Sequence, residues 1–224
     1  MSVQAVIFDM DGVIIDSEGF WQDSQIAVLA GFRVPITAQE CERYTKGKRI
    51  DEIVRVWCER YSLRIQPQRL EEKIVAQVCA SVRSRGMAMS GLYQALSCFQ
   101  AKGYRMALAT SSSRQIIAAV FDRLALWECF DAVCSADDEH FGKPHPAVYL
   151  TAVRKLGLEV SECLVIEDSL NGFIAANRAG IKTFVVAPDY QEAKFSAAAG
   201  RYATLNELIY AMQLDAQPVL TGSC

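Results

Sequence analysis

Two aspartates near the start of the chain stand where they could do chemistry together. Asp9 and Asp11 follow a short apolar run made of Val3 and Ala5–Phe8, and Gly12 comes directly after them. Because alternate side chains of an extended chain point the same way, the two carboxylates would share one side. Like charges raise each other's cost of ionisation, and a hard divalent cation such as magnesium would remove that cost. One carboxylate could then attack phosphorus while the other handles the leaving group's proton.

Two later stretches place hydroxyl and ammonium groups after apolar segments. Thr110 and Ser111 follow the apolar residues 104–109, and a hydroxyl with free backbone N–H groups there can hold phosphate oxygens. Ser113 is better placed to cap the helix that follows. Lys143 lies in a loop stiffened by two prolines, so a fixed ammonium could balance the charge of Asp9 and of a phosphate. Taken singly each signal is weak, because Ser and Thr often cap helices and lysines are usually solvated.

A second acidic pair, Glu167 and Asp168, ends the apolar residues 163–166. Asp168 would complete an oxygen-ligand shell for magnesium together with Asp9 and the backbone carbonyl of Asp11. We rank Glu167 below Asp168, as a residue that supports this shell or acts through water. Capping of the next helix is a plausible role for Ser169, but it does not explain two adjacent acids.

The apolar periodicity predicts the elements that must position these groups. Residues 20–86 have helical spacing throughout, with helices at 20–31, 37–45 and 49–61 and a fourth opened by Pro67. After Gly91 helices and strands alternate, with strands at 104–109, 130–134, 163–166 and 183–186. The pattern predicts an α/β fold, a doubly wound parallel sheet with an inserted helical cap domain. We assign residues 1–16 and 87–216 to the core domain, 17–86 to the cap, and 217–224 to a C-terminal tail.

Composition excludes several classes of protein. The 224 residues are 51% hydrophobic, which is enough to form a buried core. They carry a formal charge of −3 without a basic stripe, so nucleic acid is not an expected partner. No apolar run reaches the length of about 18 residues that a membrane span needs, and the first residues do not have the pattern of a signal peptide. The eight scattered cysteines indicate reduced thiols and a cytoplasmic protein.

Two pairs, Cys58 with Arg64 and Cys79 with Arg85, have the C-x5-R spacing of cysteine phosphatases. Both fall in helical patterns and lack the Gly-rich strand-to-helix loop that would aim N–H groups at phosphate, so we reject them.

The motifs together resemble those of the haloacid dehalogenase superfamily. DMDGVIIDSE, from Asp9, resembles the first motif, and T-S-S-S at 110–113, GKPHP at 142–146 and VIEDSLNG at 165–172 resemble the other three in the correct order. The resemblance implies a Rossmann-like core with a helical cap, Asp9 as nucleophile and Asp11 as general acid/base. It further implies Mg2+ held by Asp9, Asp11 and Asp168, and a phosphoryl group bound by Thr110, Ser111 and Lys143. True dehalogenases lack the second aspartate, so Asp11 favours phosphoryl transfer.

The resemblance also points to substrate contacts in the cap. In similar sugar-phosphate enzymes a Lys-Gly at this place contacts the substrate, and Lys46-Gly47 matches it. Arg49 is one position off the pattern of the mutases, so its role stays open. Trp21 could line the pocket or pack the cap, and packing is our preferred interpretation.

Three functions compete. The first is a magnesium-dependent phosphatase that hydrolyses a small phosphorylated metabolite, a sugar or polyol phosphate, through an aspartyl-phosphate. The second is a β-phosphoglucomutase-type phosphosugar mutase; the mutases that this chain resembles carry a His early in the cap, whereas no His precedes His140 here. The third, a phospho-accepting receiver domain, is disfavoured by length, by the inserted cap and by the order of the motifs. We expect the phosphatase, acting as a monomer or weak homodimer.

Overall fold

The strand that carries the first aspartate lies in the middle of the sheet. In this computed structural model, which describes residues 2–214, β1 (Ala5–Phe8) is flanked by β2 (Arg105–Thr110) and β4 (Cys163–Glu167). The full order is β3-β2-β1-β4-β5-β6, with β3 (Ala132–Ser135), β5 (Lys182–Val186) and β6 (Gly200–Tyr202), and all neighbours are parallel. The carboxyl ends of the strands therefore meet at one edge, as the sequence predicted.

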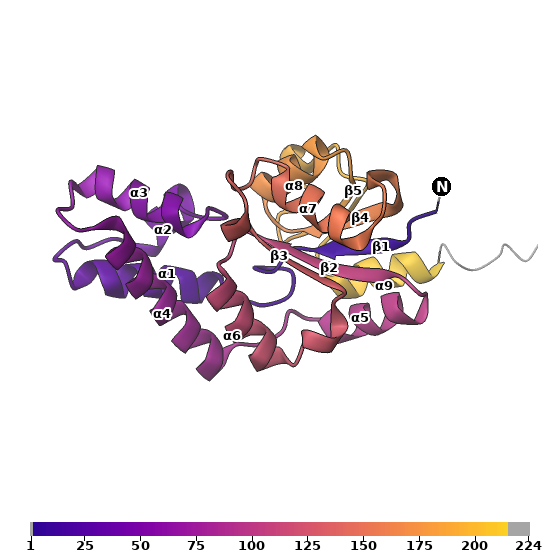
Figure 1. Ribbon diagram of the computed structural model, residues 1–224, viewed down its shortest axis with the longest axis horizontal. Coiled ribbons are helices and arrows are strands. Elements are labelled where there is room, and N and C mark those ends of the chain that lie inside the picture. The colour runs from indigo at the N-terminus through magenta and orange to yellow at the C-terminus, as the bar shows by residue number, and fades with distance from the viewer. Residues whose placement is uncertain (1, 215–224) are drawn as a thin grey trace, which may run out of the picture.

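Alternate residues of β1 enter different cores. Val6 and Phe8 pack on the face covered by α5 (Leu92–Ala101), α6 (Arg114–Leu124) and α9 (Leu205–Leu214). Ala5 and Ile7 pack on the opposite face, beneath α7 (Ala147–Leu156) and α8 (Leu170–Arg178). Helices on both faces of a parallel sheet make the fold doubly wound, and both layers are visible in Figure 1.

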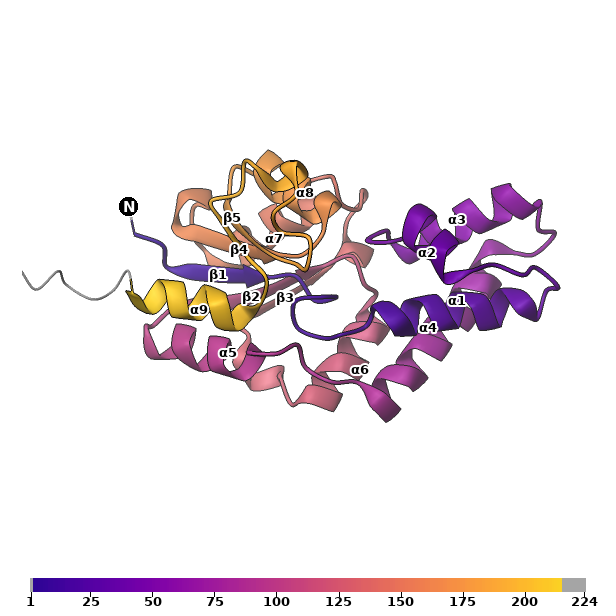
Figure 2. The ribbon, with the colours of Figure 1, turned by 180° about the vertical axis from the view of Figure 1, so that it is seen from behind.

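The remaining helices form a group at the end of the molecule that the strands point to (Figure 2). They are α1 (Glu18–Ala30), α2 (Ala38–Tyr44), α3 (Ile50–Tyr61) and α4 (Pro67–Arg85), and α4 packs against α1, α3 and α6. Thr37 caps α2 in a capping box with Glu40, and Pro67 opens α4, as the sequence indicated. The helical character predicted for residues 20–86 is confirmed, while their separation as a domain stays a prediction.

Two features differ from expectation or lie beyond it. The sequence pattern did not predict β6, which has three residues, one of them an exposed arginine, so no apolar run marks it. The predicted tail, residues 217–224, lies outside the described residues. Within the part of the chain that the structure describes, no helix combines the length and apolarity needed to span a membrane, and every cysteine is a free thiol.

Candidate active site

The strand ends and the cap helices enclose a cavity of about 310 Å³. Its walls come from residues after β1, β2 and β4 and from the loop between α2 and α3. Every site residue that the sequence singled out lines this cavity: Asp9, Asp11, Lys46, Gly47, Thr110, Ser111, Lys143 and Asp168. The structure therefore brings together all of these positions, although they lie as far apart in the chain as residues 9 and 168.

The ammonium of Lys143 joins two carboxylates at the floor of the cavity. Its Nζ lies 2.6 Å from Asp9 Oδ1 and 2.7 Å from Glu167 Oε1, and it donates to the carbonyl oxygen of Ala109 at 3.1 Å. Burial alone would lower the pKa of Lys143, but the charges of Asp9 and Glu167 outweigh it and raise the pKa above its ordinary value. Lys143 is therefore a fixed positive charge next to Asp9.

Glu167 has a more central position than its sequence ranking gave it. It is fully buried, and Oε1 accepts from Lys143 and from the Tyr149 hydroxyl at 2.7 Å. Oε2 accepts from the N–H of Asp168, the N–H of Ser169 and the Ser169 hydroxyl, at 2.9, 2.9 and 3.0 Å. Burial would raise the pKa of Glu167, but Lys143 and these donors lower it below its ordinary value. Glu167 thus fixes Lys143 and the backbone that presents Asp168.

The two remaining carboxylates at the floor are short of compensating positive charge. Burial raises the pKa of Asp9 from 3.8 to about 7; Lys143 opposes this, and the charges of Glu167 and Asp11 add to it. Burial, together with the charges of Glu167 and Asp9, raises the pKa of Asp168 well above its ordinary value. Lys143 is shared with Glu167, so it does not fully neutralise Asp9. The site favours a further cation.

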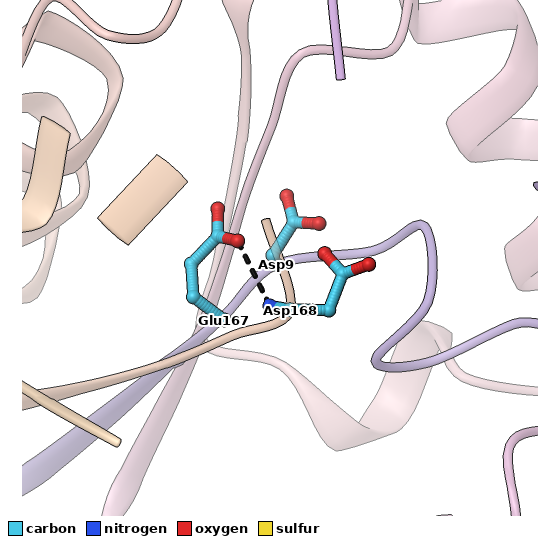
Figure 3. A group of neighbouring side chains, drawn as sticks. All are labelled: Asp9, Glu167 and Asp168. Atoms are coloured by element: carbon cyan, nitrogen blue, oxygen red, sulfur yellow. Dashed lines mark hydrogen bonds between the residues drawn. The ribbon is translucent and has the colours of Figure 1, made fainter. Parts of the chain in front are cut away.

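The acids have the chemistry and the spacing to hold that cation. One carboxylate oxygen from each of Asp9, Glu167 and Asp168 lies within 4.8 Å of the others, and Figure 3 shows the three side chains around one space. Within residues 2–214, Asp9 Oδ2 and the Asp168 carboxylate have no hydrogen-bond donor, whereas both Glu167 oxygens are occupied. An all-oxygen set of this kind fits a hard divalent cation, with Asp9 and Asp168 as the free donors.

The Asp11 carboxylate is held by three donors. Oδ1 accepts from the Ser17 hydroxyl and from Trp21 Nε1, the latter at 2.9 Å, and Oδ2 accepts from the Ser112 hydroxyl at 2.7 Å. The preferred interpretation of Trp21 as a packing residue was therefore incomplete, because its indole both lines the cavity and binds Asp11. Ser17, Trp21 and Ser112 carried no sequence signal that linked them to Asp11.

The residues after β2 present polar groups to the cavity. Thr110 is buried, and its hydroxyl accepts from the N–H of Ser112 at 3.1 Å. The Ser111 hydroxyl is buried and has no hydrogen-bond partner among the described residues, which suits an oxygen-rich ligand. Ser113 is the N-cap residue of α6, as the sequence predicted, although its hydroxyl makes no capping hydrogen bond among the described residues. Asp137 accepts from the N–H of Arg114 instead.

The loop between α2 and α3 brings cations to the wall of the cavity. Lys46 pairs with Glu42 at 2.7 Å, and Gly47 lies against Ser169, since an added Cβ would be 3.8 Å from that side chain. Lys48 also lines the cavity, and within the described residues no acid pairs with it. Lys48 was not singled out from the sequence.

Arg49 does not line the cavity. Its guanidinium pairs with Asp51 at 2.7 Å and donates to the carbonyl oxygens of Ala136 and Glu139 at 3.1 and 2.9 Å. The question that its spacing left open is thus answered in part: Arg49 links the cap to the segment that leads to Lys143.

The thiols of the two C-x5-R pairs are placed for structure. Cys58 lies in α3 and Cys79 in α4, and burial raises the pKa of both. A thiolate nucleophile requires the opposite shift, so the rejection of a cysteine phosphatase agrees with the structure.

Comparisons with known proteins agree with this site. Residues 3–180 match the haloacid dehalogenase-like hydrolase family. Hexitol phosphatase B of Escherichia coli (strain K12) is 34% identical over 210 residues, covering 92% of this chain and 94% of that protein. A phosphorylated carbohydrates phosphatase of Thermotoga maritima is 28% identical over 180 residues, covering 80% and 83%. The crystal structure of CbbY from Rhodobacter sphaeroides in complex with phosphate is similar in fold, with a TM-score of 0.82 at 22% identity and coverage of 92% and 96%.

We expect Asp9 to make stability depend on pH when no divalent cation is present. Its pKa is raised from 3.8 to about 7, so the folded state binds more protons than the unfolded state between these values. The contribution of Asp9 to the free energy of unfolding is therefore full below about pH 4 and lost as the pH rises through about 7. Urea unfolding with a chelator should show Asp9→Asn gaining stability relative to the wild type between about pH 5 and about pH 8. A pH-independent difference would contradict this charge assignment.

We expect Gly172→Ala to disrupt the floor of the cavity. A Cβ on Gly172 would lie 1.5 Å from Glu167 Oε1, and that buried carboxylate cannot move without leaving Lys143 and its other donors. The variant should lose about 2 kcal/mol or more of unfolding free energy, measured by denaturation. Gly19→Ala is the matched control, because Gly19 is exposed in α1 with nothing within 4 Å of the added Cβ. Equal stability of the two variants would rule out the packing argument.

Proposed function

Because the chain belongs to the haloacid dehalogenase-like hydrolases and is a phosphatase of that family, we propose that it hydrolyses a small sugar or polyol phosphate through an aspartyl-phosphate. The observation that carries the proposal is the ion pair of Lys143 with Asp9, 2.6 Å long, at the floor of a cavity that also holds Asp11 and Asp168. A nucleophile, an acid, a fixed ammonium and free carboxylate oxygens are the groups that phosphoryl transfer requires.

We further propose that Mg2+ is the cation, held by Asp9, Asp168 and the backbone carbonyl of Asp11. The free oxygens of Asp9 and Asp168 and their raised pKa values support this ligand set, whereas the saturated hydrogen bonds of Glu167 support a role for it outside the set. When bound, the ion supplies positive charge that keeps Asp9 ionised and offsets the charge of the phosphate.

The residues of this chain then divide the reaction into two steps. A carboxylate oxygen of Asp9 attacks phosphorus, the bond from phosphorus to the ester oxygen breaks, and Asp11 gives its proton to the leaving alcohol. Asp11 next takes a proton from water, whose oxygen attacks the aspartyl-phosphate and releases inorganic phosphate with Asp9 restored. Throughout, Lys143 balances charge, and Thr110 and Ser111 hold phosphoryl oxygens. The buried Ser111 hydroxyl, which has no hydrogen-bond partner within residues 2–214, supports the last assignment.

The size and lining of the cavity support a small substrate. A volume of about 310 Å³ is at the lower end of ligand sites, and Lys46, Gly47 and Lys48 form part of the cavity wall. The relatives named hexitol phosphatase B and phosphorylated carbohydrates phosphatase support a polyol or sugar. Hydrolysis is favoured over the mutase reaction because His140 and His145, the only histidines of the chain, do not line the cavity.

A phosphate-release assay on sugar and polyol monophosphates tests this function. With Mg2+ we expect turnover that a chelator abolishes and that Mg2+ restores. Asp9→Asn should lose at least about 1,000-fold in kcat, because no nucleophile remains. Isomerised sugar phosphate with little free phosphate would identify a mutase instead. Full activity of Asp9→Asn would exclude the aspartyl-phosphate route.

A second prediction concerns the cap wall. Lys48 lines the cavity without an acidic partner among the described residues, so we expect it to bind the substrate in the ground state and the transition state alike. Lys48→Met should raise KM about tenfold with little change in kcat, measured by steady-state kinetics. Lys73→Met is the matched control, since Lys73 is exposed on α4 and does not line the cavity. An unchanged KM would remove Lys48 from the substrate site.

A further inference from the structure

The indole of Trp21 connects the cap to the acid/base residue. Trp21 lies in the first turn of α1, its backbone N–H donates to the carbonyl of Ser17 at 3.0 Å, and its Nε1 donates to Asp11 Oδ1 at 2.9 Å. The ring is half-buried against the apolar core of the cap and also lines the cavity. One side chain of a cap helix thus binds the carboxylate that the mechanism uses as acid and base.

The donors around Asp11 distinguish its two oxygens. Oδ1 accepts from Ser17 and Trp21, while Oδ2 accepts only from the Ser112 hydroxyl among the described residues. An indole N–H can donate but never accept, so the oxygen it faces cannot carry a proton toward it. A serine hydroxyl can rotate and accept as well as donate, so Oδ2 can hold the proton without losing Ser112. The arrangement reserves Oδ2 for the proton that is transferred.

Buried hydrogen bonds fix the place of Trp21 in turn. Its carbonyl oxygen accepts from Gln25 Nε2 at 3.1 Å, and Gln25 Oε1 accepts from Trp57 Nε1 at 2.8 Å. Gln25 is 2% exposed and Trp57 is fully buried. If one of these hydrogen bonds were lost, water could not easily take the place of the missing partner. A continuous series of hydrogen bonds therefore runs from α3 through α1 to Asp11.

We propose that Trp21 is a positioning residue, whose indole N–H holds Asp11 so that Oδ2 carries the proton to the leaving group. The inference rests on the proposed role of Asp11 as acid and base. It assigns a chemical function to a tryptophan that sequence reasoning gave to packing, and it makes the geometry of proton transfer depend on the cap.

The test compares leaving groups in Trp21→Phe, which keeps the aromatic packing and removes the donor. An alkyl phosphate needs protonation of its leaving alcohol, whereas p-nitrophenyl phosphate has a leaving group stable as an anion. We expect kcat/KM to fall about 10-fold to 100-fold for a hexitol phosphate and at most about threefold for p-nitrophenyl phosphate. Trp127→Phe is the matched control, since the exposed Trp127 donates to Asp122 away from the cavity and should show neither loss.

The outcomes separate this inference from its premise. Equal losses on both substrates, or none on either, in folded Trp21→Phe would overturn the positioning role while phosphatase activity stands. In an Asp11→Asn background the Trp21→Phe loss should disappear, and an undiminished loss there would show that Trp21 acts elsewhere. If Trp21→Phe does not fold, Trp57→Phe decides: it frees Gln25 and should give a smaller loss confined to the alkyl phosphate. A wild type inactive on all phosphate esters would refute the proposed function itself.

Discussion

The buried ammonium of Lys143 is the interaction on which the site depends. Its side chain is 2% exposed and lies between carboxylates that follow β1 and end β4. A charge removed from water costs several kcal/mol unless opposite charges and hydrogen bonds compensate it, so Lys143 can be buried only if Asp9 and Glu167 are both in place. Lys143 also donates a hydrogen bond to the carbonyl oxygen of Ala109, which lies in β2. One side chain therefore joins the ends of three neighbouring strands, and the position of each acid depends on the others.

The hydrogen bonds at this point explain why the charge of Asp9 is not fully compensated although Asp9 forms a buried ion pair. Glu167 receives Lys143 and four further hydrogen-bond donors, and its pKa is lowered. Asp9 receives only Lys143 among the described residues, and its pKa rises to about 7. The ammonium is thus shared between the two carboxylates, but only Glu167 has further donors that stabilise its charge. Asp9 retains a deficit of positive charge, which a bound divalent cation would reduce.

The sequence predicted the features that follow from runs of consecutive residues, and it missed the contacts between residues that only the fold brings together. Apolar runs buried on both faces set the strands near β1, β2 and β4, and polar residues at their ends located the cavity. The central position of Glu167 in the site could not be predicted from the sequence, because it depends on the hydrogen bond from Tyr149 and on the close approach of Gly172. Trp21 has the spacing of a packing residue and does pack, and only the fold brings its N–H to Asp11.

Asp11, rather than Asp9, receives hydrogen bonds from residues of the predicted cap. In the predicted division, residues 1–16 and 87–216 form the core, and the two connections to the cap are joined there: Ile15 bridges Ala88, and Asp11 bridges Ile15. Asp9 is bound to β4 through its own N–H and to Lys143 through its side chain, so it belongs to the sheet. Asp11 takes donors from both the cap and the core. Under the proposed mechanism, the acid/base group therefore has hydrogen bonds to the predicted cap, whereas the proposed nucleophile has its bonds to the sheet and to Lys143.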